Sequence, residues 1–322
     1  MMDWSDRHCR YFHRQLTRHA LLYTEMVTAD AILRGDRQRL IGYSPEEHPV
    51  ALQLGGSDAA KLAEAAEIGA AFGYDEVNLN VGCPSDRVQE GRFGACLMAE
   101  PQLVADCVRA MRSRVSIPVT VKCRIGIDDQ DEERDFQNFI ETVSGSGCTT
   151  FIVHARKAWL KGLSPKENRE IPPLDYARVY RLKQARPDLE IIINGGVETL
   201  DACDEHLRYV DGVMLGRAAY HDPALLGFVD KRYYNGDAAD VSRADALRAL
   251  IPYAARHVAA GGKLSNITRH VLGLYNGRPR GRAFRRHLSE QAVRLGAGAD
   301  VIADAIEIVE GGYHMRGVEA AQ

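Results

Sequence analysis

Short apolar segments alternate with helical segments through about residue 230, and this alternation restricts the possible folds more than any other feature of the chain. Strands that are separated by helices pair in parallel through right-handed crossovers. Seven segments have the composition and length of buried strands, namely residues 21–24, 50–54, 76–80, 119–123, 151–154, 191–194 and 212–215. We therefore expect an α/β fold of the (β/α)8 TIM-barrel type, in which a closed barrel has eight strands.

Helical patterns lie between several of these strands. They occupy residues 58–72, with Asp58 as the expected N-cap, 101–113 and 132–144. The missing eighth strand would be the first, because the chain opens with a loop, Met1-Met2-Asp3-Trp4-Ser5, that leads into a predicted helix over 6–18. We expect that this first strand is truncated and that the numbered sequence begins late. The biological protein would then carry roughly ten to twenty-five further residues, including a strand of about five or six.

The strand pattern stops beyond about residue 240. Helices are expected over 242–260, 267–275, 282–295 and 299–309, with breaks at Gly261-Gly262 and at 277–279. The sequence thus predicts a barrel domain over residues 1–238, followed by a small C-terminal helical domain over residues 239–322.

Positive charge is concentrated in the second of these domains. Residues 263–294 hold eight Lys and Arg against Glu290 alone, so this segment carries +7 and leaves −10 on the rest of a chain whose net charge is −3. A basic segment on an acidic protein indicates a polyanionic partner such as nucleic acid. The alternative is an ordinary solvated helix face.

Cysteine usage and hydropathy indicate a cytoplasmic protein. The seven cysteines include no CxxC pair, which argues against a disulfide framework and against a structural zinc site. The N-terminus lacks the basic and apolar regions of a signal peptide, and no apolar run approaches the ~20 residues of a membrane span. We expect a cytoplasmic monomer with no metal and no membrane segment.

The segment from Glu76 to Ser85, EVNLNVGCPS, combines a strand with a reactive group. Apolar residues alternate with Asn78 and Asn80, then a glycine ends the strand and Cys83 follows. A thiol at the carboxyl end of a barrel strand is well placed for chemistry. The alternative is a small buried residue that closes the strand, since free cysteine is commonly buried and inert.

The other predicted strands also end in polar residues. These ends carry Gln53, Lys122 with Arg124, His154 with Arg156, Asn194-Gly195-Gly196, and Gly216-Arg217. The last two ends follow the strands that would be seventh and eighth in a complete barrel, where loops frequently bind phosphate. No GxGxxG fingerprint opens a βαβ unit. One phosphate site suits flavin mononucleotide, FMN, and Lys122 could stabilise negative charge on a reduced flavin ring.

Seven segments carry a specific resemblance: residues 1–10 (MMDWSDRHCR), 50–56 (VALQLGG), 78–88 (NLNVGCPSDRV), 119–126 (VTVKCRIG), 154–157 (HARK), 164–169 (SPKENR) and 193–196 (INGG). Together they resemble tRNA-dihydrouridine synthases, and subfamily A in particular, over nearly the whole chain. Family members have a strand that ends Ala-Pro-Met before Asp-Trp. Here the strand and Ala-Pro are absent, so part of the expected flavin cradle is missing.

The resemblance implies a flavin-dependent oxidoreductase that acts on a CH–CH group, reducing uridine to 5,6-dihydrouridine in the tRNA D-loop at positions 20 and 20a, with FMN and NADPH. The positions that match FMN contacts are Met1, Met2, Gln53, Lys122, His154, Asn194, Gly195, Gly196, Gly216 and Arg217. Cys83 matches the catalytic proton donor to C5 of uracil. The positions that match tRNA contacts are Asn80, Lys166, Arg169, Arg282 and Arg285. Residues 1–238 would then bind FMN, and residues 239–322 would bind tRNA.

Two other functions are compatible with parts of the sequence. An FMN barrel that acts on a free pyrimidine, similar to dihydroorotate dehydrogenase, would share the phosphate loops and the cysteine but leave the basic segment without a role. An RNA-binding protein with an inactive barrel would bind no flavin, and it would leave Cys83, Lys122 and His154 without a purpose.

Overall fold

The computed structural model describes residues 1–234 and 239–319. The predicted domain boundary at 238 falls outside these described residues and stays a prediction. The chain divides into two compact units. The first contains Met1–Met2, Leu22–Tyr43 and Pro49–Gly216, and the second contains Asp3–Leu21, Ser44–His48 and Arg217–Gln322.

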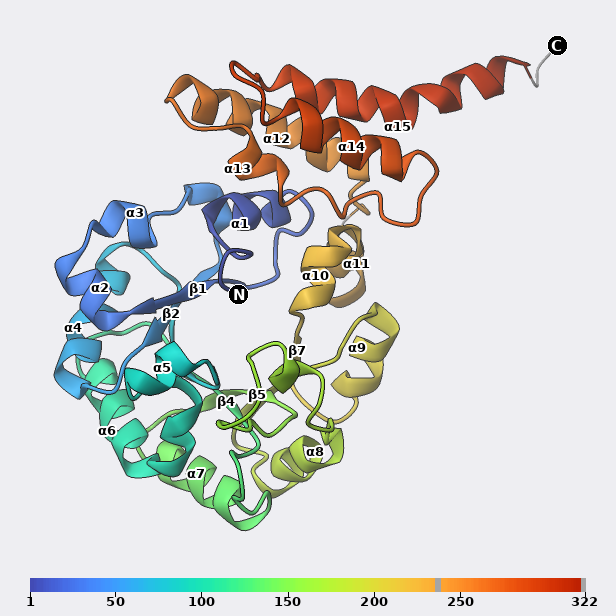
Figure 1. Cartoon of the computed structure of the whole chain (residues 1–322). Helices are drawn as coiled ribbons and strands as arrows, with labels where there is room; N and C mark the ends of the chain where they lie inside the picture. The colour runs from blue at the N-terminus through green and yellow to red at the C-terminus, as the bar shows by residue number, and fades with distance from the viewer. Residues whose placement is uncertain (235–238, 320–322) are drawn as a thin grey trace. The chain divides into compact units, whose positions relative to one another are not determined.

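A seven-stranded parallel sheet forms the centre of the first unit, and its strands pair in chain order. The strands are β1 (Leu22–Thr28), β2 (Val50–Gly55), β3 (Glu76–Val81), β4 (Val119–Arg124), β5 (Thr150–His154), β6 (Glu190–Asn194) and β7 (Gly212–Met214). All seven predicted strands are confirmed, although β1 continues to Thr28 with a register shift between Tyr23 and Met26. The sheet curls as in a TIM barrel (Figure 1), with β1 and β7 as its edges.

Helices surround the outer side of this sheet, as Figure 1 shows for α4, α6, α7 and α8. The helices of the unit are α2 (Ala29–Arg34), α3 (Arg37–Ile41), α4 (Ala59–Ala71), α5 (Asp86–Glu90), α6 (Pro101–Arg112), α7 (Arg134–Ser144), α8 (Tyr176–Ala185) and α9 (Leu200–Leu207), with the 3-10 segments η2 (Gly94–Ala99) and η3 (Glu167–Arg169). Asp58 caps α4 as predicted, because its side chain accepts hydrogen bonds from the backbone N–H groups of Ala60 and Lys61.

The second unit is helical in the part of the chain that is described. Its elements are α1 (Arg7–Arg14), η1 (Pro45–Glu47), α10 (Arg217–His221), η4 (Pro223–Phe228), α11 (Val229–Tyr233), α12 (Arg243–Ala259), α13 (Ser265–Thr268), α14 (Gly281–Gln291) and α15 (Asp300–Glu319). Among the described residues of both units, no helix is long and apolar enough to cross a membrane.

Three of the predicted helices in this unit are shorter than expected, and among them the helix over 282–295 ends at Gln291. The helix over 6–18 ends at Arg14, whose guanidinium donates hydrogen bonds to the carbonyls of Thr17 and Ala20 and holds the following turn. The helix over 267–275 is wrong beyond Thr268, where three-residue turns follow. At Gly273 the chain packs directly against the backbone of His221. A Cβ at this position would lie 2.3 Å from the carbonyl oxygen of His221.

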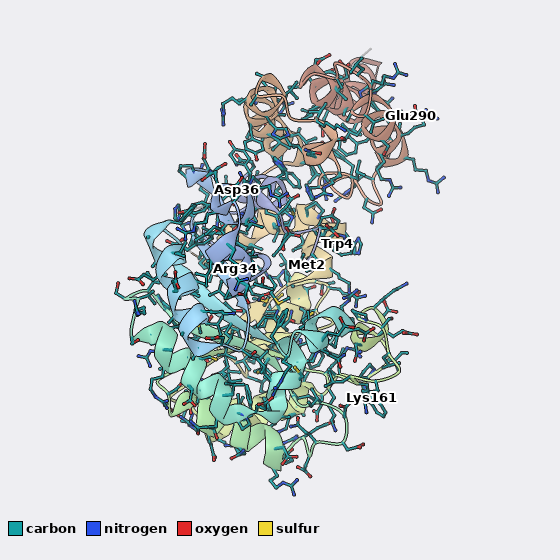
Figure 2. All side chains as sticks on the ribbon, turned by 60° about the vertical axis from the view of Figure 1, so that its left-hand side comes forward. Met2, Trp4, Arg34, Asp36, Lys161 and Glu290 are labelled. Carbon is teal, nitrogen blue, oxygen red and sulfur yellow. The ribbon has the colours of Figure 1, made fainter. Side chains whose placement is uncertain are left out.

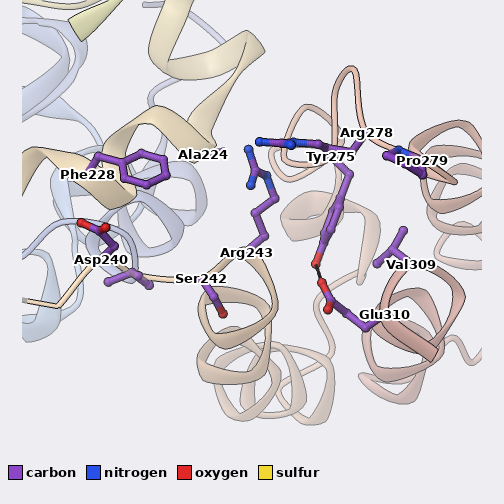
Figure 3. Close-up of a pocket in the computed structure, with 11 residues that line it drawn as sticks. Ala224, Phe228, Asp240, Ser242, Arg243, Tyr275, Arg278, Pro279, Val309 and Glu310 are labelled. Carbon is purple, nitrogen blue, oxygen red and sulfur yellow. Dashed lines mark hydrogen bonds between the residues drawn. The ribbon is translucent and has the colours of Figure 1, made fainter. Parts of the chain in front are cut away.

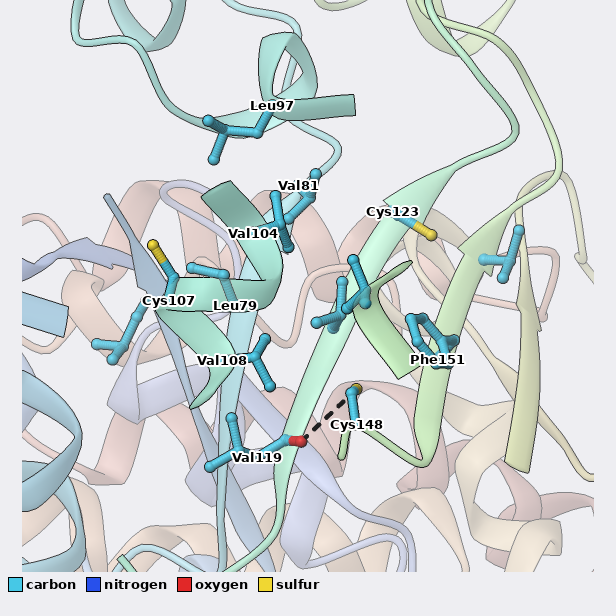
Figure 4. Packing of buried hydrophobic residues seen from close by; sticks show 14 of the residues in the cluster. Leu79, Val81, Leu97, Val104, Cys107, Val108, Val119, Cys123, Cys148 and Phe151 are labelled. Atoms are coloured by element: carbon cyan, nitrogen blue, oxygen red, sulfur yellow. Dashed lines mark hydrogen bonds between the residues drawn. The ribbon is translucent and has the colours of Figure 1, made fainter. Parts of the chain in front are cut away.

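The apolar core of the first unit lies between the sheet and its helices (Figure 4). There Leu79 and Val81 of β3 and Phe151 of β5 lie among the apolar side chains of neighbouring elements, with Val104 and Val108 of α6 close by. These five side chains are fully buried. Burial of each such side chain contributes about 1.5–3 kcal/mol relative to its exposure. The apolar residues of β3 take up one face of the strand, which leaves its polar residues on the other face.

That other face carries a buried ladder of hydrogen bonds. Asn80 Nδ2 donates to Gln53 Oε1 at 2.8 Å, and Gln53 Nε2 donates to Asn78 Oδ1 at 2.9 Å. Asn78 Nδ2 donates to Thr120 Oγ1 at 2.8 Å, and Thr120 Oγ1 donates to Glu76 Oε1 at 2.6 Å. Tyr23 also donates to Glu76 Oε1, at 2.6 Å. Because each buried amide finds partners, the polar interior avoids the cost of unsatisfied groups.

Glu76→Gln should remove one component of the pH dependence of folding stability. Burial raises the pKa of Glu76 above its ordinary value of 4.5, so the folded protein keeps a proton that the unfolded chain has lost. The stabilisation is full below about pH 4.5 and is lost as the pH rises through the folded-state pKa. Glutamine keeps an oxygen for Tyr23 and Thr120 but cannot ionise. We expect the wild type to lose stability relative to Glu76→Gln as the pH rises.

Urea unfolding of both proteins between about pH 4 and pH 8 measures this difference. Glu64→Gln, an exposed site on α4, is the control and should follow the wild type at every pH. A difference between wild type and Glu76→Gln that is constant across the range would contradict the prediction.

Candidate active site at the carboxyl ends of the strands

Cys83 lies at a rigid tip directly after β3. Asn80 Oδ1 accepts hydrogen bonds from the backbone N–H groups of Gly82 and Cys83, each at 3.0 Å. On the other side, the carbonyl of Cys83 accepts from Ala95 N at 2.9 Å. Gly94, with φ of +74°, lets the chain pass this close, because a Cβ there would lie 2.6 Å from the same carbonyl oxygen. The backbone that carries the thiol is therefore held from both sides.

The environment of Cys83 differs from that of most other cysteines. Its thiol is partly exposed and lies 3.6 Å from Ser85 Oγ, whereas Cys9, Cys107, Cys123, Cys148 and Cys203 are buried. Burial raises the pKa of Cys107, Cys123 and Cys148 to about 12, which makes these thiols poor acids and poor nucleophiles. Cys96 is also partly exposed, and its thiol donates to the carbonyl of Phe93 at 3.2 Å. Cys83 alone among the described cysteines combines exposure with a place at a strand end.

Lys122 and Asn194 meet across the strand ends. Lys122 Nζ donates to Asn194 Oδ1 at 3.2 Å, and Asn194 Nδ2 donates to the carbonyl of Met214 at 2.7 Å. Burial of the ammonium, with the nearby charge of Arg124, lowers the pKa of Lys122 from 10.5 to about 8. The strand register also pairs Lys122 with Asn80 and Asn194 with His154. The structure thus brings five predicted site residues, Gln53 included through its bond to Asn80, into one set of strand ends.

Two glycines, Gly195 and Gly196, follow β6 and form a turn in which no larger residue fits. We call this turn the glycine cradle. Gly195 has φ of +109°, and a Cβ there would lie 2.4 Å from His154 Cδ2. Gly196 has φ of +70°, and a Cβ there would lie 2.6 Å from Leu174 Cδ1. Tyr176 fixes the turn by donating to the carbonyl of Gly195 at 2.8 Å. Both positions therefore require glycine, because the backbone has positive φ and neighbouring side chains occupy the space of a Cβ.

The remaining predicted cofactor contacts lie near the start of the chain and at the end of β7. A Cβ on Gly216 would lie 3.8 Å from Met1 Sδ, so these two residues approach each other closely. Met1 and Met2 are both exposed. Arg217 begins α10 in the second unit, and its role in binding a cofactor stays a prediction.

Arg124 lies at a strand end, as the sequence indicated, and it bonds to loops of the site that the sequence did not connect with it. Its buried guanidinium donates from Nε to the carbonyl of Gly82 at 2.9 Å, and from Nη1 to the carbonyls of Lys157 and Asn168 at 2.9 and 3.0 Å. It thereby joins the Cys83 tip to the loop after β5. Burial lowers the pKa of Arg124 to about 10, which leaves it charged at neutral pH. The sequence signal was a second cation, two residues after Lys122, in an otherwise apolar strand.

The predicted RNA-contact residues fall in both units. Lys166 and Arg169 lie on the loop after β5 and are exposed. Arg282 and Arg285 are exposed on α14, whereas Phe284 and Leu288 of the same helix are buried. Most of the hydrogen-bonding groups of the Asn80 side chain have partners within the protein. Its oxygen accepts two backbone hydrogen bonds, and one of its N–H groups donates to Gln53. One N–H group of Asn80 remains for a substrate.

The second unit also contains a hollow that is separate from the strand ends. This hollow of about 370 Å³ is lined by Phe228, Arg243, Tyr275, Arg278 and Glu310 among others (Figure 3). Tyr275 donates to Glu310 within it at 2.8 Å, and none of the predicted site residues lines it. Within residues 1–234 and 239–319, no group of three or more His, Cys, Asp or Glu side chains could hold a metal ion.

Fold and site together define an α/β-barrel protein that carries, at its strand ends, a partly exposed thiol on a held backbone and a glycine cradle. A family model described as "Dihydrouridine synthase (Dus)" matches residues 1–307. The chain therefore belongs to the dihydrouridine synthase family, as its motifs indicated.

Individual relatives match over nearly their full length. A protein named tRNA-dihydrouridine(20/20a) synthase from Salmonella typhi is 59% identical over 310 residues, which is 96% of this chain and 93% of that protein. Proteins of the same name from Escherichia coli (strain K12) and Xanthomonas campestris pv. campestris (strain ATCC 33913 / DSM 3586 / NCPPB 528 / LMG 568 / P 25) are each 58% identical. These matches cover 96% and 95% of this chain, and 90% of each of the two proteins.

Arg124→Met should destabilise the first unit, because it leaves the buried carbonyls of Gly82, Lys157 and Asn168 without their donor. We expect a loss of roughly 2–5 kcal/mol in the free energy of unfolding, since each unsatisfied buried group costs about 1–3 kcal/mol. Urea unfolding measures the loss. Arg114→Met is the matched control, because Arg114 is exposed and pairs only with the exposed Glu67, so its loss should cost less than about 1 kcal/mol. Equal stability of the two variants would contradict this role.

Proposed function

We propose that this protein reduces uridine to 5,6-dihydrouridine in the D-loop of tRNA, at positions 20 and 20a. FMN would be its bound cofactor and NADPH its reductant, and it would act in the cytoplasm as a monomer. The observation that carries the proposal is the thiol of Cys83, on a backbone held at the tip of β3, with Lys122 on the neighbouring strand. The names of relatives with 58–59% identity support both the reaction and the positions in tRNA.

The residues at the strand ends fit FMN. Gly195 and Gly196 would let the phosphate approach the backbone, and a side chain at either position would collide with its neighbours. Gln53, Lys122, His154 and Asn194 offer amide, ammonium and imidazole groups to a flavin ring. When bound, FMN supplies the hydride that reduces C6 of the uracil ring. Lys122 provides a positive charge at this site, and its pKa of about 8 keeps most of that charge at neutral pH.

Cys83 completes the reduction by donating its thiol proton to C5 of uracil. Hydride addition to C6 leaves the former π electron pair delocalised over C5 and O4. Protonation at C5 then leaves a single C5–C6 bond in the product and a thiolate on Cys83. A positioned general acid requires a fixed backbone, and the bonds from Asn80 and Ala95 supply it. The remaining N–H of Asn80 is available to an acceptor oxygen on the uracil edge.

The target base must leave its stack before it can reach these groups, because enzymes that act on a base extrude it into their site. The exposed arginines of α14 would bind phosphates of the same tRNA, which positions the RNA without reading its sequence. The pyrimidine-reductase alternative gives these arginines no function. The inactive-barrel alternative gives none to the fixed thiol and the cradle.

Cys83→Ala should purify with FMN and accept electrons from NADPH but form dihydrouridine about 10²–10⁴-fold more slowly. The visible spectrum gives the flavin content, anaerobic bleaching by NADPH gives its reduction, and nuclease digestion with mass spectrometry gives the product. Cys96→Ala is the matched control and should keep wild-type rates, because Cys96 is also a partly exposed thiol but faces the Phe93 carbonyl. A colourless, folded wild type that FMN does not reconstitute would refute the cofactor, and full activity of Cys83→Ala would refute the acid.

Arg282→Glu with Arg285→Glu should weaken tRNA binding and flatten its dependence on salt. Each lost phosphate contact should reduce the slope of log K against log salt by roughly one. Filter binding at several salt concentrations measures this slope, and flavin content should not change. The control reverses the same number of charges at Arg109 and Arg114, which are exposed on or just after α6. An unchanged slope in the α14 variant, or an equal change in both, would show that α14 does not bind phosphates.

A further inference from the structure

Trp159 is an aromatic side chain that the structure exposes on a firmly held backbone. Its side chain follows β5 in the loop that also carries Lys166, and the residue is 50% exposed. Beneath it lies Asn168, which is fully buried. Asn168 Oδ1 accepts from the backbone N–H of Trp159 at 2.8 Å, and Asn168 Nδ2 donates to the carbonyl of Trp159 at 2.9 Å. The buried side-chain amide of Asn168 thus holds the backbone N–H and C=O of Trp159, while the indole of Trp159 stays exposed.

The same loop is bonded to the Cys83 tip. Gln89 Nε2 donates to the carbonyl of Leu160 at 3.0 Å and to the carbonyl of Pro84 at 2.9 Å. Arg124 forms a second connection, from Gly82 to the carbonyl of Asn168. Trp159 therefore belongs to the same hydrogen-bonded assembly as the thiol, although its ring has no part in the chemistry described above.

The loop that carries the indole is rich in Lys and Arg. Residues 156–169 contain five Lys and Arg and a single acidic residue, Glu167. Glu167 is committed to the loop itself, since it accepts from the backbone and hydroxyl of Ser164 at 2.8 and 2.7 Å. Lys161 and Lys166 are exposed, and Figure 2 shows Lys161 projecting from the edge of the first unit. Lys161 and Lys166 are therefore two exposed cations of this loop that can face the phosphates of a polyanion.

We propose that the indole of Trp159 stacks on an unpaired base of the RNA substrate, next to the uridine that enters the site. The proposal rests on the proposed function. A flat, rigid, half-exposed ring among cations suits a nucleobase, because bases stack on aromatic side chains while their phosphates face Lys and Arg. The bonds between this loop and the Cys83 tip hold the backbone that carries the ring against the tip that carries the thiol. When the target uridine leaves the stack, the neighbouring base loses its stacking contact with it. Stacking on Trp159 replaces that contact.

Substitution of Trp159 separates stacking from charge. Trp159→Leu keeps an apolar side chain but loses the aromatic face, so tRNA binding should weaken roughly 5- to 100-fold with an unchanged salt slope. Trp159→Phe keeps an aromatic face and should bind within about threefold of the wild type. Ile171→Ala is the control for loss of an exposed apolar side chain near the same loop, because Ile171 is 60% exposed, and it should bind as the wild type does. The backbone bonds to Asn168 do not use the indole, so all variants should fold and retain flavin.

Fluorescence gives a second measurement, since Trp4 and Trp159 are the two tryptophans of the chain. Unmodified tRNA should quench the emission of the wild type, and Trp159→Phe should lose most of this quenching. The proposal is overturned if Trp159→Leu binds tRNA as tightly as Ile171→Ala, or if Trp159→Phe keeps the full quenching. It is also overturned if Trp159→Leu alters the NADPH dependence of flavin reduction without RNA but leaves tRNA binding intact. A wild type that binds tRNA and forms no dihydrouridine would refute the proposed function and leave the stacking measurement valid.

Discussion

The side chain of Asn80 is the interaction on which the site depends most. Its oxygen holds the backbone of Cys83, and its nitrogen begins the ladder that continues through Gln53, Asn78 and Thr120 to Glu76. The strand tip would otherwise be less constrained, since the pairing of β3 with β4 ends at Val81 and a glycine precedes the cysteine. The barrel thus uses its polar inner face to fix a reactive residue at one end, while the apolar outer face of the same strands builds the core.

Much of this arrangement could be predicted from residue patterns. Alternation of apolar and polar residues located β3 and showed which residues share a face, and the glycine after it located the tip. The order of strands and helices gave the barrel class, because parallel strands with crossovers have few other arrangements. The carboxyl ends of parallel strands lie together, and this rule alone predicts that Gln53, Lys122, His154 and Asn194 meet at one edge of the sheet.

Other features depend on contacts that the linear sequence does not contain. Arg124 was noticed as a charge at a strand end, but its three carbonyl partners lie on separate loops. Asn168 is a polar residue in a basic segment, and nothing in its neighbours indicates that it is fully buried. The helix expected over 267–275 failed for a related reason, since the approach of Gly273 to the backbone near His221 is a tertiary contact. The partners of Arg124, the burial of Asn168 and the end of this helix therefore depend on tertiary contacts, which local sequence patterns do not contain.

The ladder beneath the thiol has a direction. From Cys83 to Glu76 every donor points the same way, so each amide orientation determines the next, and dipoles aligned in this manner reinforce one another. A carboxylate in place of any one amide would bring an acceptor where the next rung also offers an acceptor, and the remaining side chains would have to turn over together. The inner residues of this barrel are consequently not independent sites for redesign. If one of these residues were exchanged alone, the dipoles on its two sides would point in opposite directions. Two acceptors would then face each other in the interior of the protein.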